Sequence, residues 1–127
     1  MPIVSLGMDL MQISRLEQAL ERRGTRFLER IFTPGERAYC ERRKARVTHY
    51  AGRYAVKEAV MKVLGTGWAR GVRWIDIEVT RAPGAAPEVV LHGRSAEIAA
   101  ARGIARIHIT ITHDADIAAA VAVGEKD

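Results

Sequence analysis

The chain has 127 residues, of which 48% are apolar, and it carries 20 Lys and Arg residues against 15 Asp and Glu residues. This length is typical of one domain, so we expect residues 1–127 to form a single domain. No run approaches the roughly 18 consecutive apolar residues of a transmembrane helix, and the opening residues lack the basic start of a secretory signal. The lone cysteine, Cys40, has no disulfide partner within the chain. Membrane-spanning and disulfide-stapled classes are therefore excluded, and we expect a cytoplasmic protein.

The positive charge is concentrated in one stretch. Nine Lys or Arg residues and three Glu residues lie between Arg22 and Arg46, a local surplus of six positive charges, whereas the rest of the chain carries 11 basic and 12 acidic residues. Such a block suits an anionic partner, which could be nucleic acid, a phosphorylated ligand or an acidic protein. Solvated, arginine-rich helix faces explain the same composition equally well.

The first third of the chain predicts one strand and two helices. Residues 3–8 are mostly apolar, which is typical of a short buried strand. Ser14 is followed three residues later by a glutamate, a capping-box pattern, and Gly24 suits the end of the helix that starts there. A second capping box at residues 33–36 has proline at the tolerated first helical position and predicts a helix that runs to about Lys44.

Residues 47–64 predict a long helix. Apolar side chains recur at helical spacing, and Gly65 ends the pattern. The stripe consists of Val56, Ala59, Val60 and Val63. At 1.5 Å per residue this helix would be roughly 27 Å long, enough to cross the domain.

Beyond this helix the periodicity changes to two, which is typical of half-buried strands. The predicted elements are, in order, a strand at 75–80, a turn at 82–87, a strand at 88–92, a helix at about 95–102, a strand at 107–112, a turn at 113–116 and a strand at 117–123. Together they predict an α+β fold in which an antiparallel sheet packs on the long central helix.

Three polar residues are candidates for chemistry, and each also has an ordinary structural explanation. Asp9 follows the first strand, where a carboxylate is either an exposed strand terminus or a ligand at the sheet edge. Glu58 and Lys62 are four residues apart on the long helix, away from the apolar stripe. They form either a surface ion pair worth about 0.2–0.5 kcal/mol, or a site in which Glu58 binds a hard cation and Lys62 a phosphate, as Mg²⁺ sites require.

Three other features are less specific. In Gly65-Thr66-Gly67 the first glycine is explained as a helix cap, and the second allows close approach to a ligand. The segment is not a Walker loop, because its glycines follow the helix. His113 lies in a turn with Asp114 and Asp116, without the spacing of a zinc site. Nothing near Cys40 in the sequence resembles a paired base, so an ordinary thiol is expected.

Three segments together resemble one family. Gly7-Met8-Asp9-Leu10 with Arg15 is similar to the G-[IL]-D-[IL]…R opening of holo-acyl-carrier-protein synthases. Residues 53–67 resemble that family's R-[FY]-A-x-K-E-A-x-x-K-x-x-G-T-G signature, and residues 110–113 resemble its late [ST]-x-[ST]-H strand end. The match runs in order from residue 3 to about 125. By this resemblance the chain is identified as a member of the small type of phosphopantetheinyl transferase, with the fold of that family.

The resemblance implies a Mg²⁺-dependent reaction. It would move 4′-phosphopantetheine from coenzyme A to a serine hydroxyl of apo acyl carrier protein, releasing adenosine 3′,5′-bisphosphate and giving the holo carrier for fatty-acid or polyketide synthesis. Asp9 and Glu58 map onto the family's metal ligands. The family's catalytic residues map onto Asp9, Glu58 and Lys62. The residues that map onto coenzyme A contacts are Arg53, Lys62, Gly65, Thr66 and His113.

A metal ion and an ammonium group suit the charge that such a transfer develops on the phosphate oxygens. The acceptor of the serine proton stays open among a metal-bound water, Glu58 and another nearby carboxylate.

The resemblance also implies partners. Family members form homotrimers with active sites between subunits, and the isoleucines at 107, 109 and 111 could pack either in the core or at that interface. The family's first helix meets the acidic carrier protein through basic side chains, which matches the positive stretch described above and would raise on-rate and specificity. The docking residues expected here are Arg15, Arg22 and Arg26, followed by Arg30.

The chain departs from the family pattern in two places. Ala85-Ala86-Pro87 stands where the family usually has Gly-Lys-Pro, so a charged contact to the nucleotide is not expected there. Thr110 and Thr112 replace the more frequent serines but keep the hydroxyl groups.

Two other function classes compete with this interpretation. A nucleic-acid-binding module would interleave aromatic residues with the basic ones or carry a known motif. The basic stretch holds Phe27, Phe32 and Tyr39 but no recognisable motif, and such a module leaves the polar candidates unexplained. A Mg²⁺-dependent phosphohydrolase would use the same carboxylates and lysine.

Overall fold

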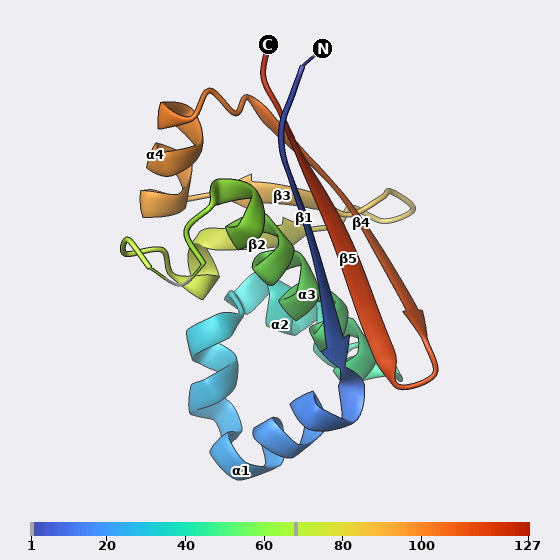
Figure 1. Ribbon diagram of the computed structural model, residues 1–127. Coiled ribbons are helices and arrows are strands. Elements are labelled where there is room, and N and C mark those ends of the chain that lie inside the picture. The colour runs from blue at the N-terminus through green and yellow to red at the C-terminus, as the bar shows by residue number, and fades with distance from the viewer. Residues whose placement is uncertain (1, 68) are drawn as a thin grey trace.

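The computed structural model describes residues 2–67 and 69–127, which fold as helices packed on two antiparallel sheets (Figure 1). The elements are β1 (Ile3–Gln12), α1 (Ile13–Ile31), α2 (Pro34–Glu41), α3 (Arg46–Leu64), the 3-10 turn η1 (Trp74–Asp76), β2 (Ile77–Thr80), β3 (Glu88–Leu91), α4 (Gly93–Ala101), β4 (Arg106–Asp114) and β5 (Ile117–Glu125). The predicted α+β class is confirmed, with α3 as the central helix.

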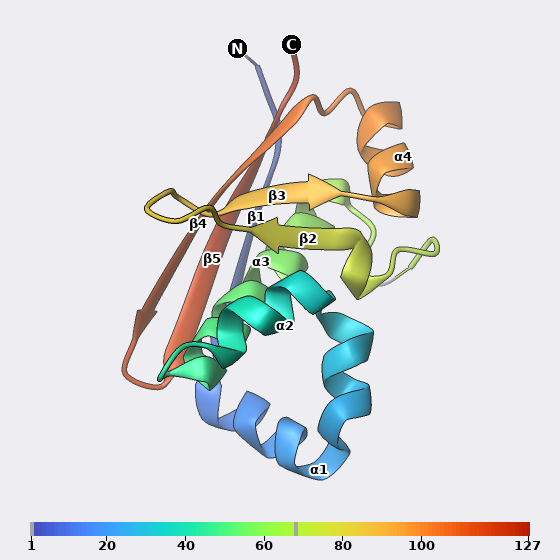
Figure 2. The ribbon, with the colours of Figure 1, turned by 180° about the vertical axis from the view of Figure 1, so that it is seen from behind.

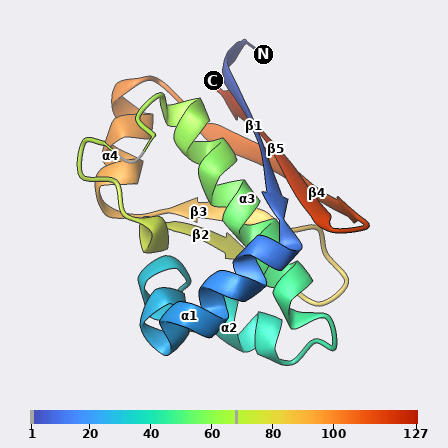
Figure 3. The same ribbon diagram turned by 60° about the horizontal axis from the view of Figure 1, so that its bottom comes forward.

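The larger sheet has the order β1-β5-β4, so the last strand of the chain lies in the middle and pairs with the first (Figure 1). Strands β2 and β3 form a separate hairpin sheet, which together with α4 covers another side of α3 (Figure 2). Helices α1 and α2 pack near the first turns of α3 (Figure 3). No helix among residues 2–67 and 69–127 is long and apolar enough to cross a membrane.

Strand β1 lies unusually close to α3. A Cβ atom at Gly7 would overlap the carbonyl oxygen of Ala59 on α3, so only glycine fits at this point of contact. The facing residues of the middle strand are also small and buried, namely Ala118, Ala120 and Ala122. This close contact brings the β1 side chains that flank Gly7 on the same face next to polar residues of α3.

The predicted apolar stripe of α3 is confirmed, because Val56, Ala59, Val60 and Val63 are all fully buried. Gly65 ends the helix with φ 77°, the left-handed conformation expected of a C-terminal cap. The helix is buried on further sides as well: Tyr50 and Ala51 belong to a second core cluster that it forms with α1 and α2.

A buried ion pair fixes α2 and the second sheet to α3. The side chains of Lys57 and Glu36 are fully buried, with Lys57 Nζ 2.9 Å from Glu36 Oε1. The predicted capping box is confirmed, since Thr33 Oγ1 accepts from the Glu36 N–H, and Glu36 Oε1 accepts from the Thr33 N–H. Glu36 Oε2 accepts from the Val79 N–H. One carboxylate therefore caps a helix, pairs with a lysine and binds a strand.

The start of the chain differs from the prediction. The first strand was expected to end before Asp9, but β1 continues to Gln12 because β5 pairs with it along its length. The predicted capping box at Ser14 is wrong: the Ser14 N–H and hydroxyl both donate to the carboxylate of Asp116, which the β4–β5 turn brings to the start of α1. Gly24 has non-helical backbone angles, so the first helical segment ends there as predicted. The glycine kinks α1 at φ 66° and ψ −150°, and helical structure continues beyond it to Ile31.

Other boundaries shift by a few residues. Helix α2 ends at Glu41, before the expected Lys44. Ile75 and Asp76 belong to η1, so β2 begins only at Ile77, and the Asp76 carboxylate accepts two hydrogen bonds from Arg73 there. The isoleucines at 107, 109 and 111 are partly buried and pack against the core cluster around α3.

Candidate active site

Asp9 and Lys62 meet where β1 crosses α3. Lys62 Nζ lies 3.6 Å from Asp9 Oδ1 and donates a 2.7 Å hydrogen bond to the carbonyl oxygen of Met8. The side chain of Asp9 is 18% exposed, whereas that of Lys62 is 54% exposed. The carboxylate therefore sits in the floor of the site, and the ammonium group lies at its open side.

Burial raises the pKa of Asp9 above its ordinary value, and the nearby Lys62 ammonium group offsets this effect only in part. A partly desolvated carboxylate gains from a cation of higher charge, because desolvation weakens its hydration but strengthens its attraction to an ion.

Glu58 belongs to the same group of residues as Asp9, because the charges of both carboxylates act on Tyr54. The ring of Tyr54 stacks on Trp74 with centroids 4.8 Å apart. Burial and the negative charges of nearby Glu58 and Asp9 raise the pKa of Tyr54 to about 12, while the charge of Arg15 acts in the opposite direction. Tyr54 is thus surrounded by the predicted site residues.

Sequence reasoning missed Tyr54 as a site residue. The signal was its spacing, because a residue four positions before Glu58 on a helix lies on the same face. Arg15, expected to contact a carrier protein, lies close enough to Tyr54 to affect its pKa and therefore borders the carboxylate group.

The donor set of this group fits Mg²⁺. Among residues 2–67 and 69–127, no cluster of three or more His, Cys, Asp or Glu side chains could hold a metal ion by itself. Asp9 and Glu58 offer two carboxylates and no soft ligand, and Mg²⁺ is commonly bound by one or two carboxylates together with water and substrate phosphates. These residues suit a metal ion that arrives with, or is completed by, a phosphorylated substrate.

Arg53 and His113 belong to a second, positively charged group. Arg53 is 3% exposed, and its guanidinium carbon lies 4.1 Å from the centre of the Tyr39 ring. Arg43 lies 3.5 Å from the same ring centre. Burial lowers the pKa of His49, and the charges of Arg53, Arg43 and His113 lower it further. Basic side chains from α3, β4 and the segment joining α2 to α3 thus converge on one region, around Tyr39 of α2.

One atom of this group is suited to an anion. Within the described part of the chain, Nε of Arg53 is buried and has no hydrogen-bond partner. Burial alone would raise the pKa of Tyr39, yet the positive charges of Arg53 and Arg43 lower it overall. A phosphate would satisfy both the field and the free donor.

Gly65 and Thr66 directly follow the α3 turn that carries Lys62. The carbonyl oxygen of Val63 accepts a 2.6 Å hydrogen bond from Arg102, the residue that follows α4, and this bond secures the end of α3. Thr66 is buried, and its hydroxyl donates to the carbonyl oxygen of Gly67. The loop is held in place by these contacts beside Lys62, while Arg53 lies more than two turns earlier on the helix.

The basic residues of α1 lie on both sides of its kink. Arg15, Arg22 and Arg26 are exposed, with Gly24 between the last two. Part of the positive stretch is used internally, since Arg46 forms a 3.0 Å ion pair with Glu41. Exposed basic residues also remain outside α1, at Arg42 and Lys44 in the segment between α2 and α3.

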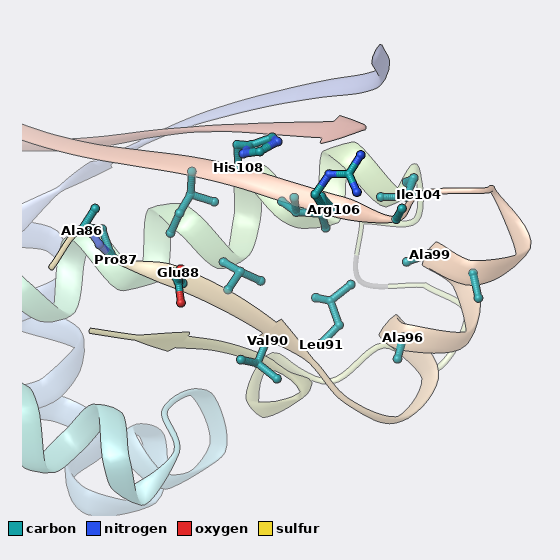
Figure 4. A pocket seen from close by; sticks show the side chains of 15 residues that line it. Ala86, Pro87, Glu88, Val90, Leu91, Ala96, Ala99, Ile104, Arg106 and His108 are labelled. Carbon is teal, nitrogen blue, oxygen red and sulfur yellow. The ribbon is translucent and has the colours of Figure 1, made fainter. Parts of the chain in front are cut away.

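One well-defined pocket lies elsewhere. A cavity of about 780 Å³ is lined mainly by apolar side chains of β3, α4 and β4, with Arg106 and His108 among its polar residues (Figure 4). It contains none of the predicted site residues. The candidate active site is instead an open arrangement of polar groups on β1 and α3, which fits a site that a second molecule completes.

Comparisons with known proteins agree with this geometry. A family model described as the 4′-phosphopantetheinyl transferase superfamily matches residues 5–122. The holo-[acyl-carrier-protein] synthase of Anaeromyxobacter sp. (strain K) is 46% identical over 126 residues, which cover 97% of this chain and 96% of that protein.

Two solved structures are also similar. The holo-[acyl-carrier-protein] synthase from Neisseria meningitidis matches with a TM-score of 0.90 and 27% identity, over 98% of this chain and 100% of that one. The Helicobacter pylori synthase in complex with coenzyme A matches with a TM-score of 0.81 and 31% identity, over 94% of this chain and 99% of that one. The chain therefore belongs to the 4′-phosphopantetheinyl transferase superfamily and, within it, to the holo-acyl-carrier-protein synthases.

Proposed function

We propose that this protein transfers 4′-phosphopantetheine from coenzyme A to a serine hydroxyl of apo acyl carrier protein in a Mg²⁺-dependent reaction, releasing adenosine 3′,5′-bisphosphate. The observation that carries the proposal is the meeting of Asp9 with Lys62 in the same group as Glu58. The names of the relatives, and the coenzyme A bound in the Helicobacter pylori structure, support the choice of substrates.

Each residue of this group has a distinct part. Asp9 and Glu58 would hold Mg²⁺, which supplies positive charge to the phosphate under attack and to the leaving phosphate. Lys62 is exposed, and its ammonium group is held only by a hydrogen bond to the Met8 carbonyl oxygen and by the charge of Asp9. It can therefore turn to a phosphate of the donor. A metal ion on Asp9 would favour that exchange, because it takes over the carboxylate that now attracts Lys62.

The remaining contacts to coenzyme A fall to the other predicted residues. Arg53 and His113 supply positive charge in the second group, and the free Nε of the buried Arg53 supports a phosphate there. Gly65 and Thr66 would line the donor next to Lys62. We assign no charged nucleotide contact to Ala85-Ala86-Pro87, where the family's lysine is absent.

We further propose that the protein forms a homotrimer with active sites between subunits. Supporting this, Leu6, Met8 and Leu10 of β1 are between 56% and 64% exposed, on the sheet face that points away from α3. Val121 of β5 lies opposite Met8 on that face and is also exposed. An uncovered apolar strip of this kind suits a subunit interface.

The carrier protein would dock on α1, through Arg15, Arg22 and Arg26. Acidic carriers would be attracted to this helix, and Arg15 would lie at the junction between the docked carrier and the carboxylate group. We place the reaction in the cytoplasm, where a buried free thiol such as Cys40 stays reduced.

Mass spectrometry tests the proposal directly. Apo carrier protein incubated with coenzyme A, Mg²⁺ and this protein should gain one phosphopantetheine mass, and a chelator should prevent the gain. An unchanged mass with both a fatty-acid and a polyketide carrier contradicts the proposal. Breakdown of coenzyme A without any carrier would instead support a Mg²⁺-dependent phosphohydrolase.

A further inference from the structure

Lys62 faces the carboxylate that is proposed to bind the metal ion. Its Nζ lies 3.6 Å from Asp9 Oδ1 and donates a 2.7 Å hydrogen bond to the carbonyl oxygen of Met8, the preceding residue of β1. The same ammonium group is thus held by a charge and by a backbone acceptor. In the metal-free protein, Asp9 already has a cation beside it.

The Met8 carbonyl oxygen is a fixed acceptor. Strand β1 lies so close to α3 that a Cβ at Gly7 would overlap the Ala59 carbonyl oxygen and lie 3.2 Å from Lys62 Cβ. Strand β5 also pairs with β1 along its length, so this backbone has little freedom to move. The hydrogen bond therefore keeps the ammonium group beside Asp9, although the Lys62 side chain is 54% exposed.

A metal ion on Asp9 and an ammonium group beside it repel each other. The repulsion is strong here, because the Asp9 side chain is only 18% exposed and water screens it poorly. A divalent cation must either bind against this repulsion or displace Lys62, which costs the ion pair and the hydrogen bond to Met8. In both cases Lys62 lowers the affinity of the empty site for metal.

A phosphate of the donor removes this cost. When the Lys62 ammonium group turns to a phosphate, the Asp9 carboxylate loses its counter-ion and attracts a divalent cation more strongly. By thermodynamic linkage, a metal ion that displaces Lys62 from Asp9 raises the affinity for the phosphate by the same factor. Lys62 thus couples two binding events that involve different ligands.

We propose that Lys62 blocks the metal site in the substrate-free protein and is exchanged for the divalent cation when the donor phosphates bind. The free protein then holds little metal, and metal and coenzyme A bind cooperatively. The inference rests on the proposed function, because it takes Asp9 as a metal ligand and coenzyme A as the donor.

The test removes the charge and keeps a side chain of similar length. In Lys62→Met without coenzyme A, the dissociation constant for Mn²⁺, measured by electron paramagnetic resonance of the free ion, should fall about fivefold or more. Coenzyme A should then tighten Mn²⁺ binding by a smaller factor than in the unmodified protein, after correction for Mn²⁺ bound to coenzyme A itself. An unchanged or weaker Mn²⁺ affinity without coenzyme A overturns the inference, since a lysine that only binds phosphate has no effect in that state.

The matched control is Arg94→Met. Arg94 makes the same two kinds of contact on α4, a 3.2 Å ion pair with Glu97 and a 3.1 Å hydrogen bond to the carbonyl oxygen of Arg70. None of these residues belongs to the candidate active site. The variant loses the same charge and should keep its Mn²⁺ affinity. If it tightens Mn²⁺ binding as much as Lys62→Met does, the effect is one of net charge and the inference is overturned.

Asp9→Asn separates this inference from the proposed function. If Mn²⁺ affinity is lost in Asp9→Asn but not raised in Lys62→Met, only the blocking role fails. If Asp9→Asn binds Mn²⁺ as well as the unmodified protein does, Asp9 is not a metal ligand, and the proposed assignment fails together with the inference.

The double variant shows whether Lys62 acts through Asp9. In the Asp9→Asn protein, adding Lys62→Met should change Mn²⁺ affinity by less than about twofold, because the carboxylate that joins the two effects is gone. An increase as large as in the single Lys62→Met variant would show that the lysine acts through another group, which contradicts the exchange on Asp9.

Discussion

Lys62 on α3 lies 3.6 Å from Asp9 on β1, and this contact joins the first strand of the chain to the central helix at the candidate active site. The lysine side chain is exposed, whereas the carboxylate is mostly buried, so substitutions at the two residues should have different effects. A substitution at Asp9 affects a desolvated group, whereas one at Lys62 affects a side chain that can leave its partner.

Replacing Asp9 should separate activity from stability. In Asp9→Asn the rate of transfer should fall about a hundredfold or more, because the metal site keeps only one carboxylate. The melting temperature without metal should not fall, since burial disfavours the charged form of this side chain. Transfer is measured by the mass gain of the carrier, and stability by thermal unfolding. A large drop in melting temperature would instead assign Asp9 a structural role.

The two lysines of the family signature should behave in opposite ways. Lys57→Met breaks a fully buried ion pair and should lower the free energy of unfolding by about 3–5 kcal/mol, as measured in urea. Lys62→Met is the matched control on the same helix: it should change stability by less than about 1 kcal/mol and sharply lower the rate of transfer. Equal stability losses in the two variants would contradict this division of roles.

Gly7→Ala tests the close contact between β1 and α3. The new Cβ would overlap the carbonyl oxygen of Ala59, so β1 must move, at a cost of about 1–3 kcal/mol in the free energy of unfolding. Because this movement also separates Asp9 from Lys62, transfer should fall as well. Gly35→Ala is the control, since its Cβ would meet only ordinary contacts at 3.7 Å and beyond. A Gly7→Ala protein of unchanged stability and activity would show that the contact is not required.

Leu6→Glu tests the proposed trimer. Leu6 is 64% exposed on the outer face of β1, so a charge there is tolerated by a monomer but not inside an apolar interface. Light scattering after size-exclusion chromatography should show a trimer for the unmodified protein and a smaller species for this variant, with loss of transfer. Val90→Glu, on the exposed side of β3, should leave the assembly intact. A monomeric unmodified protein that is fully active would refute the shared site.

Reversing charges on α1 should affect only the carrier substrate. In Arg22→Glu combined with Arg26→Glu, the KM for acyl carrier protein should rise at least about tenfold, while the KM for coenzyme A stays unchanged. Steady-state kinetics at two salt concentrations measure both values. Lys126→Glu, at the far end of the chain, is the control for a charge reversal away from α1. A rise in the KM for coenzyme A would place the donor phosphates on α1 instead.

Much of the local structure follows from the sequence. The helix at 47–64 and its cap at Gly65 were predicted almost to the residue, because helical periodicity and a left-handed glycine depend only on neighbours along the chain. The capping box at Thr33 was predicted for the same reason. The equally good pattern at Ser14 failed, because Asp116 from a distant turn takes both hydrogen bonds.

The family and its reaction were also evident from the sequence alone, since the signature at 53–67 combines residue types and spacing that a helix presents on defined faces. The signature does not reveal that one of its two lysines is buried and the other exposed. Only the tertiary structure places Lys57 inside the protein on Glu36, and leaves Lys62 at the surface on Asp9.

The sequence by itself thus determined the helices and the alternating strands, because these depend on local hydrogen bonding and periodicity, and its resemblance to a known family supplied the candidate residues. The tertiary structure decided that Asp9 lies within a strand, that Tyr54 stacks on Trp74, and which face of the large sheet stays uncovered. These features arise because the last strand pairs with the first and α3 packs across both, which brings together residues from opposite ends of the chain.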